Sequence, residues 1–209
     1  MKIILLMTIG VLLSGCGNNS STSTGNRIKQ KKDKMLDKKT GSSKDSKNDP
    51  ANSECLIKKL ENAGKGVSGI RLELTGDVFG GLKLGMKKDE VIRLLGEPQS
   101  KSKPTMEAAT GYMRSEWKWN SRGVKLSMNE GKSSTTVIFI SLRSPFSGKS
   151  SCGIGIGDLY SKMLRIYSKY KNIDTPDPES RVFGSIYGGI LFGEKDGKIS
   201  SIDVGAFAE

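Results

Sequence analysis

The chain contains no histidine and only three cysteines among its 209 residues. The lack of histidine removes the commonest general base and the commonest neutral metal ligand, and three dispersed cysteines do not form a zinc-binding cluster. Gly153, Gly155 and Gly157 alternate without the GxGxxG spacing of a dinucleotide loop, and nothing orders the acids Asp174 and Asp177 into a catalytic pair. The sequence therefore predicts a non-catalytic protein with no cofactor, no metal and no catalytic residues.

Residues 1–15 form an export signal. Lys2 precedes the apolar run IILLMTIGVLL, which is too short to span a bilayer as a stable helix, and small residues follow it. Residues 13–16, LSGC, resemble the bacterial lipobox, in which the cysteine is acylated and becomes the mature N-terminus. We therefore expect lipid attachment at Cys16, with an ordinary cleaved signal as the alternative. Gly17 replaces the aspartate that favours inner-membrane retention in lipoproteins, so we expect the outer membrane, facing the periplasm.

A basic segment, residues 16–52, follows the signal. After Cys16 it carries nine Lys or Arg and four Asp, within a formal net charge of +12 for the chain, and very few large apolar residues. Such a segment cannot bury enough surface to offset its ordering entropy, which predicts a flexible tether that reaches roughly 30 to 35 Å. Export argues against a nucleic-acid partner. The interleaved aspartates favour a solvated spacer over weak contact with anionic lipid headgroups or other acidic envelope material.

Two cysteines remain in the folded region, which begins at about Ser53. In an exported protein this pair predicts a disulfide between Cys55 and Cys152, with two free thiols as the alternative. In the chain-entropy description, a closed loop of about a hundred residues stabilises the fold by at most ~4 to 5 kcal/mol.

An internal repeat organises the folded region. Residues 81–98, GLKLGMKKDEVIRLLGEP, are typical of a short strand at Leu82 and Leu84, a glycine turn, one helix and a Gly/Pro stop. A shift of 72 positions lays residues 153–157 on 81–85 and 163–167 on 91–95 without a gap. The repeat predicts two copies of one unit, the first within residues 53–145, after an N-terminal helix, and the second in residues 146–209.

The remaining patterns complete an α+β prediction of two tandem helix-on-antiparallel-sheet units. Helices are expected at 53–63, with Ser53 as a possible N-cap, and from Asp158, as a cap, to about 170. Strands are expected at 70–74, 111–119, 124–128, 137–142 (the central one), 152–156 and 181–187, with a hairpin of 189–192 and 199–204 around Asp196-Gly197. The helices then cover one face of the sheet, and the opposite face is free for a partner.

Trp117 and Trp119 lie on one face of the predicted strand, together with Met113. The opposite face carries Arg114, Glu116 and Lys118. Because strand alternation must bury one face, we expect the tryptophans to belong to the core. Outward-facing tryptophans would instead be anchors for a partner. We assign no partner-binding residues from the sequence.

The first unit resembles the SmpA/OmlA family of small outer-membrane lipoproteins, through Gly85, Met86, Val91, the pair Leu94-Leu95 and the stop Gly96-x-Pro98. The tandem arrangement resembles the related β-lactamase inhibitory protein family, in which two units form one concave sheet that grips another protein. The resemblance implies a lipid-anchored envelope protein that supports outer-membrane assembly or integrity through a protein partner, with no small-molecule substrate. The alternative is an inhibitor or immunity lipoprotein that blocks an enzyme or toxin. Carriage of a small apolar ligand would need a cavity between sheet and helices.

Overall fold

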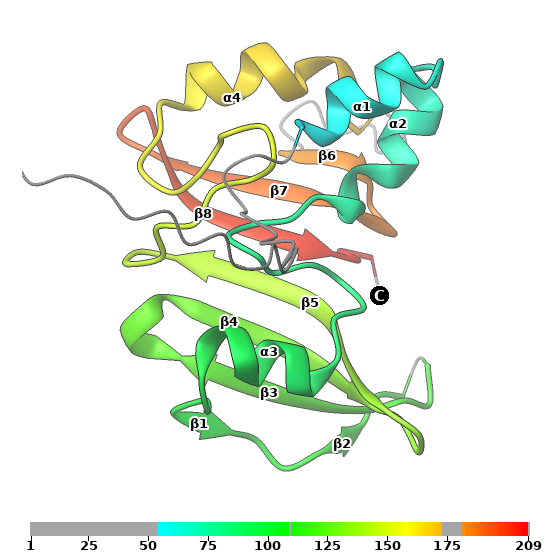
Figure 1. The fold of residues 1–209 in the computed structure, drawn as a ribbon, viewed down its shortest axis with the longest axis vertical. Coiled ribbons are helices and arrows are strands. Elements are labelled where there is room, and N and C mark those ends of the chain that lie inside the picture. Colours follow the sequence, from blue (N-terminus) through cyan, green and yellow to red (C-terminus); the bar gives the residue numbers. More distant parts are fainter. Residues whose placement is uncertain (1–53, 109, 173–180, 209) are drawn as a thin grey trace, which may run out of the picture. The chain divides into compact units, whose positions relative to one another are not determined.

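The computed structural model describes residues 54–108, 110–172 and 181–208. These residues belong to one compact unit. The predicted signal peptide, the tether, Cys16 and Ser53 lie outside the described residues, as do Asp174 and Asp177. The described part combines helices with one antiparallel sheet, so the fold is α+β (Figure 1).

The sheet has eight strands in the order β1-β3-β4-β5-β8-β7-β6, with β2 also paired to β3. Every pairing is antiparallel. The strands are β1 (Ser100–Lys101), β2 (Thr105–Met106), β3 (Met113–Trp119), β4 (Val124–Glu130), β5 (Thr135–Arg143), β6 (Val182–Ser185), β7 (Gly188–Lys195) and β8 (Lys198–Gly205). The predicted central position of β5 is confirmed, because β5 pairs with β4 on one side and with β8 on the other.

The helices lie on one side of this sheet, which faces the viewer in Figure 1. They are α1 (Leu56–Asn62), α2 (Val67–Glu73), α3 (Lys88–Leu95) and α4 (Tyr160–Tyr167), with the 3-10 turns η2 (Leu74–Gly76), η3 (Asn120–Arg122) and η4 (Ser168–Tyr170). Helix α3 covers the half of the sheet around β3 and β4, whereas α4, α1 and α2 lie at the β6 and β7 side.

Two helices form where the apolar stripes predict them. In α3 the stripe buries Val91 and Leu95, and in α4 it buries Met163 and Tyr167. The predicted cap at Asp158 is wrong. Leu159 occupies the N-cap of α4 and offers no side-chain acceptor, while the Asp158 carboxylate instead accepts a hydrogen bond from the backbone N–H of Gly155 at 2.9 Å.

The predicted strand at residues 70–74 is also wrong, since these residues belong to α2 and η2. Ile70 and Leu74 are four residues apart and share the buried side of the helical segment, whereas Leu72 is 70% exposed. The apolar segments at 82–84 and 152–156 form turns with isolated bridges, Phe79 to Leu82 and Lys149 to Gly155, rather than the predicted strands.

The core lies between the helices and the sheet. Trp117 is 5% exposed and Trp119 is 2% exposed, which confirms that they belong to the core. The ring of Tyr167 packs against Phe192 and Phe183, with centroids 5.2 and 6.2 Å away. The predicted first helix is present as α1, although it begins at Leu56 with Cys55 at the N-cap.

Candidate functional site: the open face of the sheet

Side chains that alternate along β3 distinguish the two faces of the sheet. The Trp119 indole N–H donates a hydrogen bond to the Gly96 carbonyl at the end of α3, at 3.1 Å, which fixes the inner face. Strand alternation then places Arg114, Glu116 and Lys118 on the opposite face, which carries no helix in the described residues. We call this side of the sheet the open face.

The register of the paired strands shows which residues of the other strands also lie on the open face. Lys118 lies opposite Lys125, Lys125 opposite Ser141, Ser141 opposite Asp203, and Asp203 opposite Leu191. A second row places Glu116 opposite Ser127 and Ser127 opposite Phe139. The open face thus draws on both halves of the chain.

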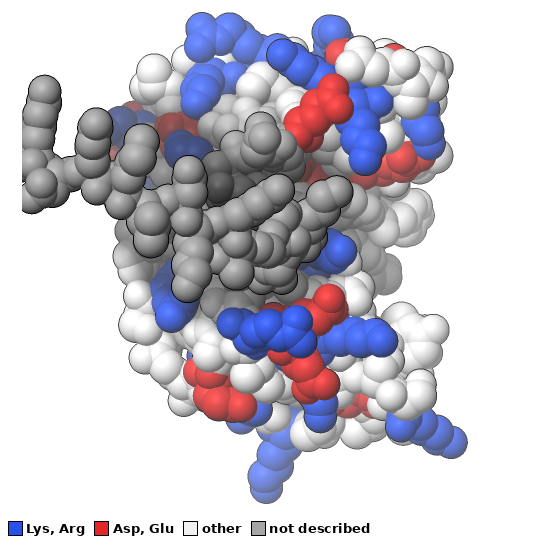
Figure 2. Space-filling view, in the orientation of Figure 1, with Lys and Arg blue, Asp and Glu red and all other residues white. Residues whose placement is uncertain are grey.

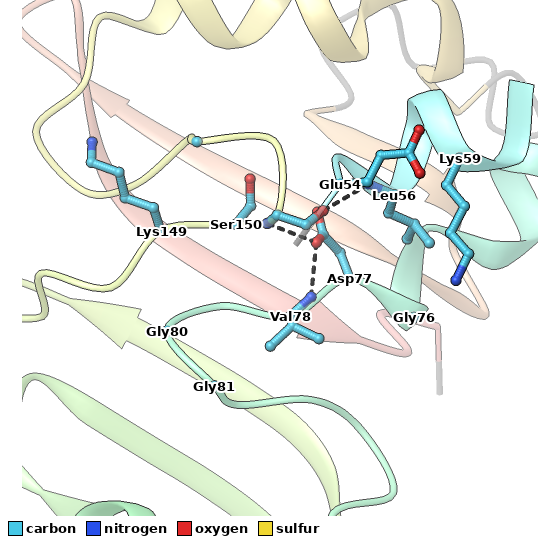
Figure 3. A pocket seen from close by; sticks show the side chains of 12 residues that line it. Glu54, Leu56, Lys59, Gly76, Asp77, Val78, Gly80, Gly81, Lys149 and Ser150 are labelled. Atoms are coloured by element: carbon cyan, nitrogen blue, oxygen red, sulfur yellow. Dashed lines mark hydrogen bonds between the residues drawn. The ribbon is translucent and has the colours of Figure 1, made fainter. Parts of the chain in front are cut away.

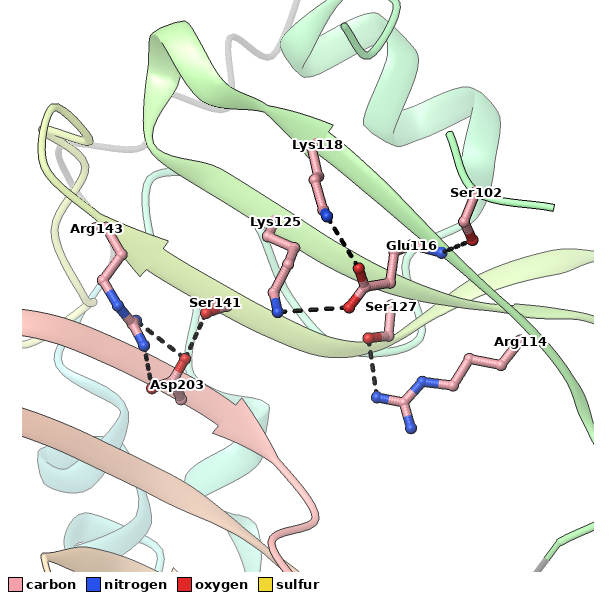
Figure 4. Close-up of polar contacts among 9 residues, drawn as sticks. All are labelled: Ser102, Arg114, Glu116, Lys118, Lys125, Ser127, Ser141, Arg143 and Asp203. Carbon is pink, nitrogen blue, oxygen red and sulfur yellow. Dashed lines mark hydrogen bonds and ion pairs between the residues drawn. The ribbon is translucent and has the colours of Figure 1, made fainter. Parts of the chain in front are cut away.

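Ion pairs connect the β3 and β4 side of the open face (Figure 4). The Glu116 carboxylate pairs with Lys118 at 3.2 Å and with Lys125 at 3.4 Å. The hydrogen bond from Lys118 holds the pKa of Glu116 below its ordinary value, against the opposing effect of burial. The two lysines thus share one carboxylate, which leaves a positive surplus here.

Arg114 makes a second set of contacts on the same side. Its guanidinium donates to Glu107 at 2.7 Å and to the hydroxyl of buried Ser127 at 3.0 Å. The hydrogen bond from Thr110 is the main cause that lowers the pKa of Glu107, and the bond from Arg114 adds to it. This carboxylate therefore stays ionised and holds the arginine across β3 and β4.

A bidentate ion pair spans the junction of β5 and β8, the strands that join the two halves of the sheet. The Arg143 guanidinium donates to the two carboxylate oxygens of Asp203 at 3.0 and 2.9 Å, and the Ser141 hydroxyl donates to Asp203 at 2.6 Å (Figure 4). A planar guanidinium held by two bonds has little freedom to reorient. The polar surface at the junction is therefore rigid.

An aromatic pair lies beside this network. Phe139 meets Phe207 edge to face, with ring centroids 5.8 Å apart, and both rings are partly exposed. The Phe139 ring occupies the space where a side chain at Gly205 would lie. Sequence reasoning missed this pair because Phe139 and Phe207 come together only through the β5–β8 pairing, and a register shift in β4 disturbs simple alternation in β5.

A pocket of about 640 Å³ lies elsewhere, beside the start of α1 (Figure 3). The carboxylate of Asp77, which is 1% exposed, adjoins it and accepts hydrogen bonds from the backbone N–H groups of Val78 and Ser151, at 2.8 and 3.0 Å, and from the Tyr167 hydroxyl, at 3.0 Å. Burial raises the pKa of Tyr167 well above its ordinary value. These bonds occupy the carboxylate, which joins its own segment after η2 to the loop at Ser151 and to α4 at Tyr167. The pocket is lined by α1 and loops, so it is not the cavity between sheet and helices that ligand carriage requires.

The structure joins Cys55 and Cys152 by a disulfide, the pairing that the sequence predicts. The bond ties the start of α1 to the loop that contains Ser151. The Leu56 backbone N–H donates to the hydroxyl of Ser151 at 2.9 Å, and the backbone N–H of Ser151 donates to Asp77.

In the part of the chain that the structure describes, no group of three or more His, Cys, Asp or Glu side chains is arranged to hold a metal ion. No helix within those residues combines the length and the apolar character needed to cross a membrane.

Comparison of the chain with protein-family models, with curated proteins and with solved structures found no match.

Proposed function

We propose that this chain is a lipid-anchored, non-catalytic protein of the cell envelope that binds another protein through the open face. One observation carries the proposal: the helices cover a single side of the sheet, and the other side presents a rigid polar network beside an aromatic pair. Aromatic anchors surrounded by polar groups are typical of protein–protein interfaces. The carboxylates of this network are engaged by cations, an arrangement that suits recognition better than proton transfer.

The N-terminal sequence supports the anchor. Residues 1–15 act as the signal peptide, Cys16 carries the lipid, and residues 16–52 form the tether. Several acyl chains at one cysteine give lasting attachment, because each buried methylene contributes roughly 0.8 kcal/mol. The protein resides at the outer membrane and faces the periplasm.

The two helices that follow the repeat support a tandem arrangement of two units, residues 53–145 and 146–209. Helix α4 begins and ends 72 residues after α3. Equivalent positions share their burial: Val91 and Met163 are both buried, and so are Leu95 and Tyr167. The second unit lacks the Gly-x-Pro stop, with Ser168 at the position of Gly96.

The leading role is support of outer-membrane assembly or integrity, in line with the SmpA/OmlA resemblance. Inhibition of an enzyme or toxin is the second candidate, and the pairing of β5 with β8 favours it. This pairing joins the strands of both proposed units into one sheet, as in the tandem units of the β-lactamase inhibitory protein family.

Site-specific photocrosslinking in cells tests the proposal. A crosslinker at Lys125, on the open face, should capture the partner, whereas one at Lys88, on α3, should not. Phe207→Ala should weaken the complex about thirtyfold, because an aromatic anchor in an interface contributes about 2 kcal/mol or more. Equal capture from both positions would contradict binding through the open face.

The identity of the captured protein separates the two roles. Integral outer-membrane or assembly proteins, together with permeability defects on deletion, support the assembly role. A soluble hydrolase or toxin, blocked by the purified protein and with no growth defect until that target is supplied, supports the inhibitor role. An unacylated Cys16 in the mass spectrum of the purified protein would refute the anchor.

A further inference from the structure

Helix α2 exposes apolar side chains that the fold does not use. Ile70 points into the core, but Val67 is 45% exposed and Leu72 is 70% exposed. Leu164 of α4 is also exposed. A helix in contact only with water and its own core gains nothing from such side chains on its outer side.

Positive charge gathers on the same group of helices. Together α1, α2, α4 and η4 carry six Lys or Arg and two Glu, whereas α3 carries two of each sign. Figure 2 shows Lys and Arg side chains over α4, α1 and α2. The excess of basic over acidic residues is therefore found in α1, α2, α4 and η4, and α3 does not share it.

The helices of this group adjoin one another. The Tyr170 hydroxyl of η4 donates to Glu61 of α1 at 2.8 Å, and Lys169 pairs with the same carboxylate at 3.6 Å. Helix α2 contacts both α1 and η4. The second carboxylate, Glu73, pairs with Lys65.

Both carboxylates of the group are thus occupied, while Lys58 and Arg165 make no ion pair with any described residue. We call this surface the three-helix patch and define it by its exposed apolar and basic side chains, Val67, Leu72, Leu164, Lys58, Arg165 and Lys169.

We propose that the three-helix patch docks on the surface of an anionic phospholipid bilayer. Lysine and arginine are attracted to anionic headgroups, and exposed aliphatic side chains enter the boundary between headgroups and acyl chains. The patch offers both kinds of side chain on neighbouring helices, which is the combination that interfacial helices use.

The position of the tether supports the same occupant, on the assumption of the lipid anchor proposed above. The described chain begins at Glu54, directly before α1, which belongs to the patch. As a random coil, a tether of about 35 residues places the domain at a root-mean-square distance of roughly 30 to 35 Å from the bilayer. At such a short range the effective concentration of lipid is high, so a weak patch is enough to orient the domain.

Amine footprinting on the full-length lipidated protein tests this docking. The protein is reconstituted into phosphatidylcholine vesicles with or without about 30% phosphatidylglycerol, and the acetylation rate of each lysine is measured. In anionic vesicles the rates at Lys58 and Lys169 should fall about threefold or more relative to Lys132, which lies in the exposed β4–β5 turn.

Matched variants separate docking from general effects of charge and hydrophobicity. Leu72→Ser and Arg165→Glu should abolish the protection. Met106→Ser and Lys132→Glu should preserve it, because Met106 is as exposed as Leu72, at 71%, but lies on β2 at the other edge of the sheet.

Equal acetylation rates in the two kinds of vesicle would overturn the proposal. Protection that appears in cells but not in anionic vesicles would also overturn it, in favour of a protein that covers the patch. Loss of the acyl chains from the mass spectrum would instead contradict the anchor, and loss of crosslinks from Lys125 would contradict partner binding. Failure of the patch is thus distinguishable from failure of the proposed function.

Discussion

Substitution of Tyr167 by phenylalanine tests the buried network around Asp77. The Tyr167 hydroxyl donates to one carboxylate oxygen of Asp77 at 3.0 Å and lies 3.2 Å from the Ser150 hydroxyl. The tyrosine ring itself packs against Phe183 and Phe192, which also contact each other. Phenylalanine keeps that packing, so the substitution removes the hydroxyl alone.

The expected loss of stability follows from the burial of the Asp77 carboxylate and from the number of its hydrogen-bond donors. Asp77 is 1% exposed, and without Tyr167 the second carboxylate oxygen has no hydrogen-bond donor among the described residues. A hydrogen bond to a charged group contributes about 1.5 to 3 kcal/mol, so Tyr167→Phe should lower the free energy of unfolding by that amount. For a domain of this size, each kcal/mol should lower the Tm by roughly 2 to 4 °C.

Urea unfolding of the oxidised full-length protein measures this cost. Tyr160→Phe is the matched control, because the Tyr160 hydroxyl makes no hydrogen bond to a described residue, and it should change stability by less than about 0.5 kcal/mol. In an Asp77→Asn background, Tyr167→Phe should cost less than about 1 kcal/mol, because the acceptor is no longer charged. An equal cost in the two backgrounds would show that the hydroxyl does not act through Asp77.

Three further predictions concern other parts of the fold. Replacing Cys55 and its disulfide partner by serine should lower the free energy of unfolding by at most about 4 to 5 kcal/mol, because the bond joins residues 97 positions apart; reduction of the parent protein should reproduce the loss in urea titrations. Gly123→Ala should cost more than Gly85→Ala in the same assay: both glycines have positive φ, 63° and 76°, but only at Gly123 would the added methyl overlap a neighbouring backbone. Because the Lys118 pairing lowers the pKa of Glu116, its contribution to stability is present above the unfolded pKa of about 4.5 and is lost as the pH falls through the folded value. Stability curves of the parent and of Glu116→Gln should therefore converge below that range.

The sequence predicted the elements whose patterns have only one interpretation. The apolar stripes of α3 and α4 fit a helical period alone, and the hairpin of β7 and β8 follows from Asp196-Gly197, both of which adopt left-handed φ, 53° and 73°. Residues 70–74 have no such unique pattern. Apolar side chains at every second position fit a strand, but Ile70 and Leu74 are also one helical turn apart, and the fold follows that second spacing.

The part of the candidate site that could be predicted is the part set by the alternation of side chains along a single strand. Arg114 and its neighbours on β3 follow from the alternation that buries the tryptophans. The ion pair of Arg143 with Asp203 joins residues 60 positions apart, across strands whose pairing no local pattern specifies. The same pairing brings Phe139 to Phe207, so the centre of the open face could be found only from the three-dimensional fold.

The two surfaces proposed here are compatible because they lie on opposite sides of one sheet. The three-helix patch belongs to the helical side, where the described chain begins, whereas the open face lies behind it. If the patch rests on the bilayer, the open face points toward the periplasm, and the tether need not cross it. Salt should separate the two interactions, because the attraction of the lysines and the arginine of the patch to lipid headgroups is screened over about 8 Å at physiological ionic strength. The open face carries the surplus of one lysine charge at Glu116, but its Asp203 carboxylate is paired with Arg143 and its aromatic contacts do not depend on charge. A rise in salt should therefore release the domain from the lipid surface before it dissociates the protein partner.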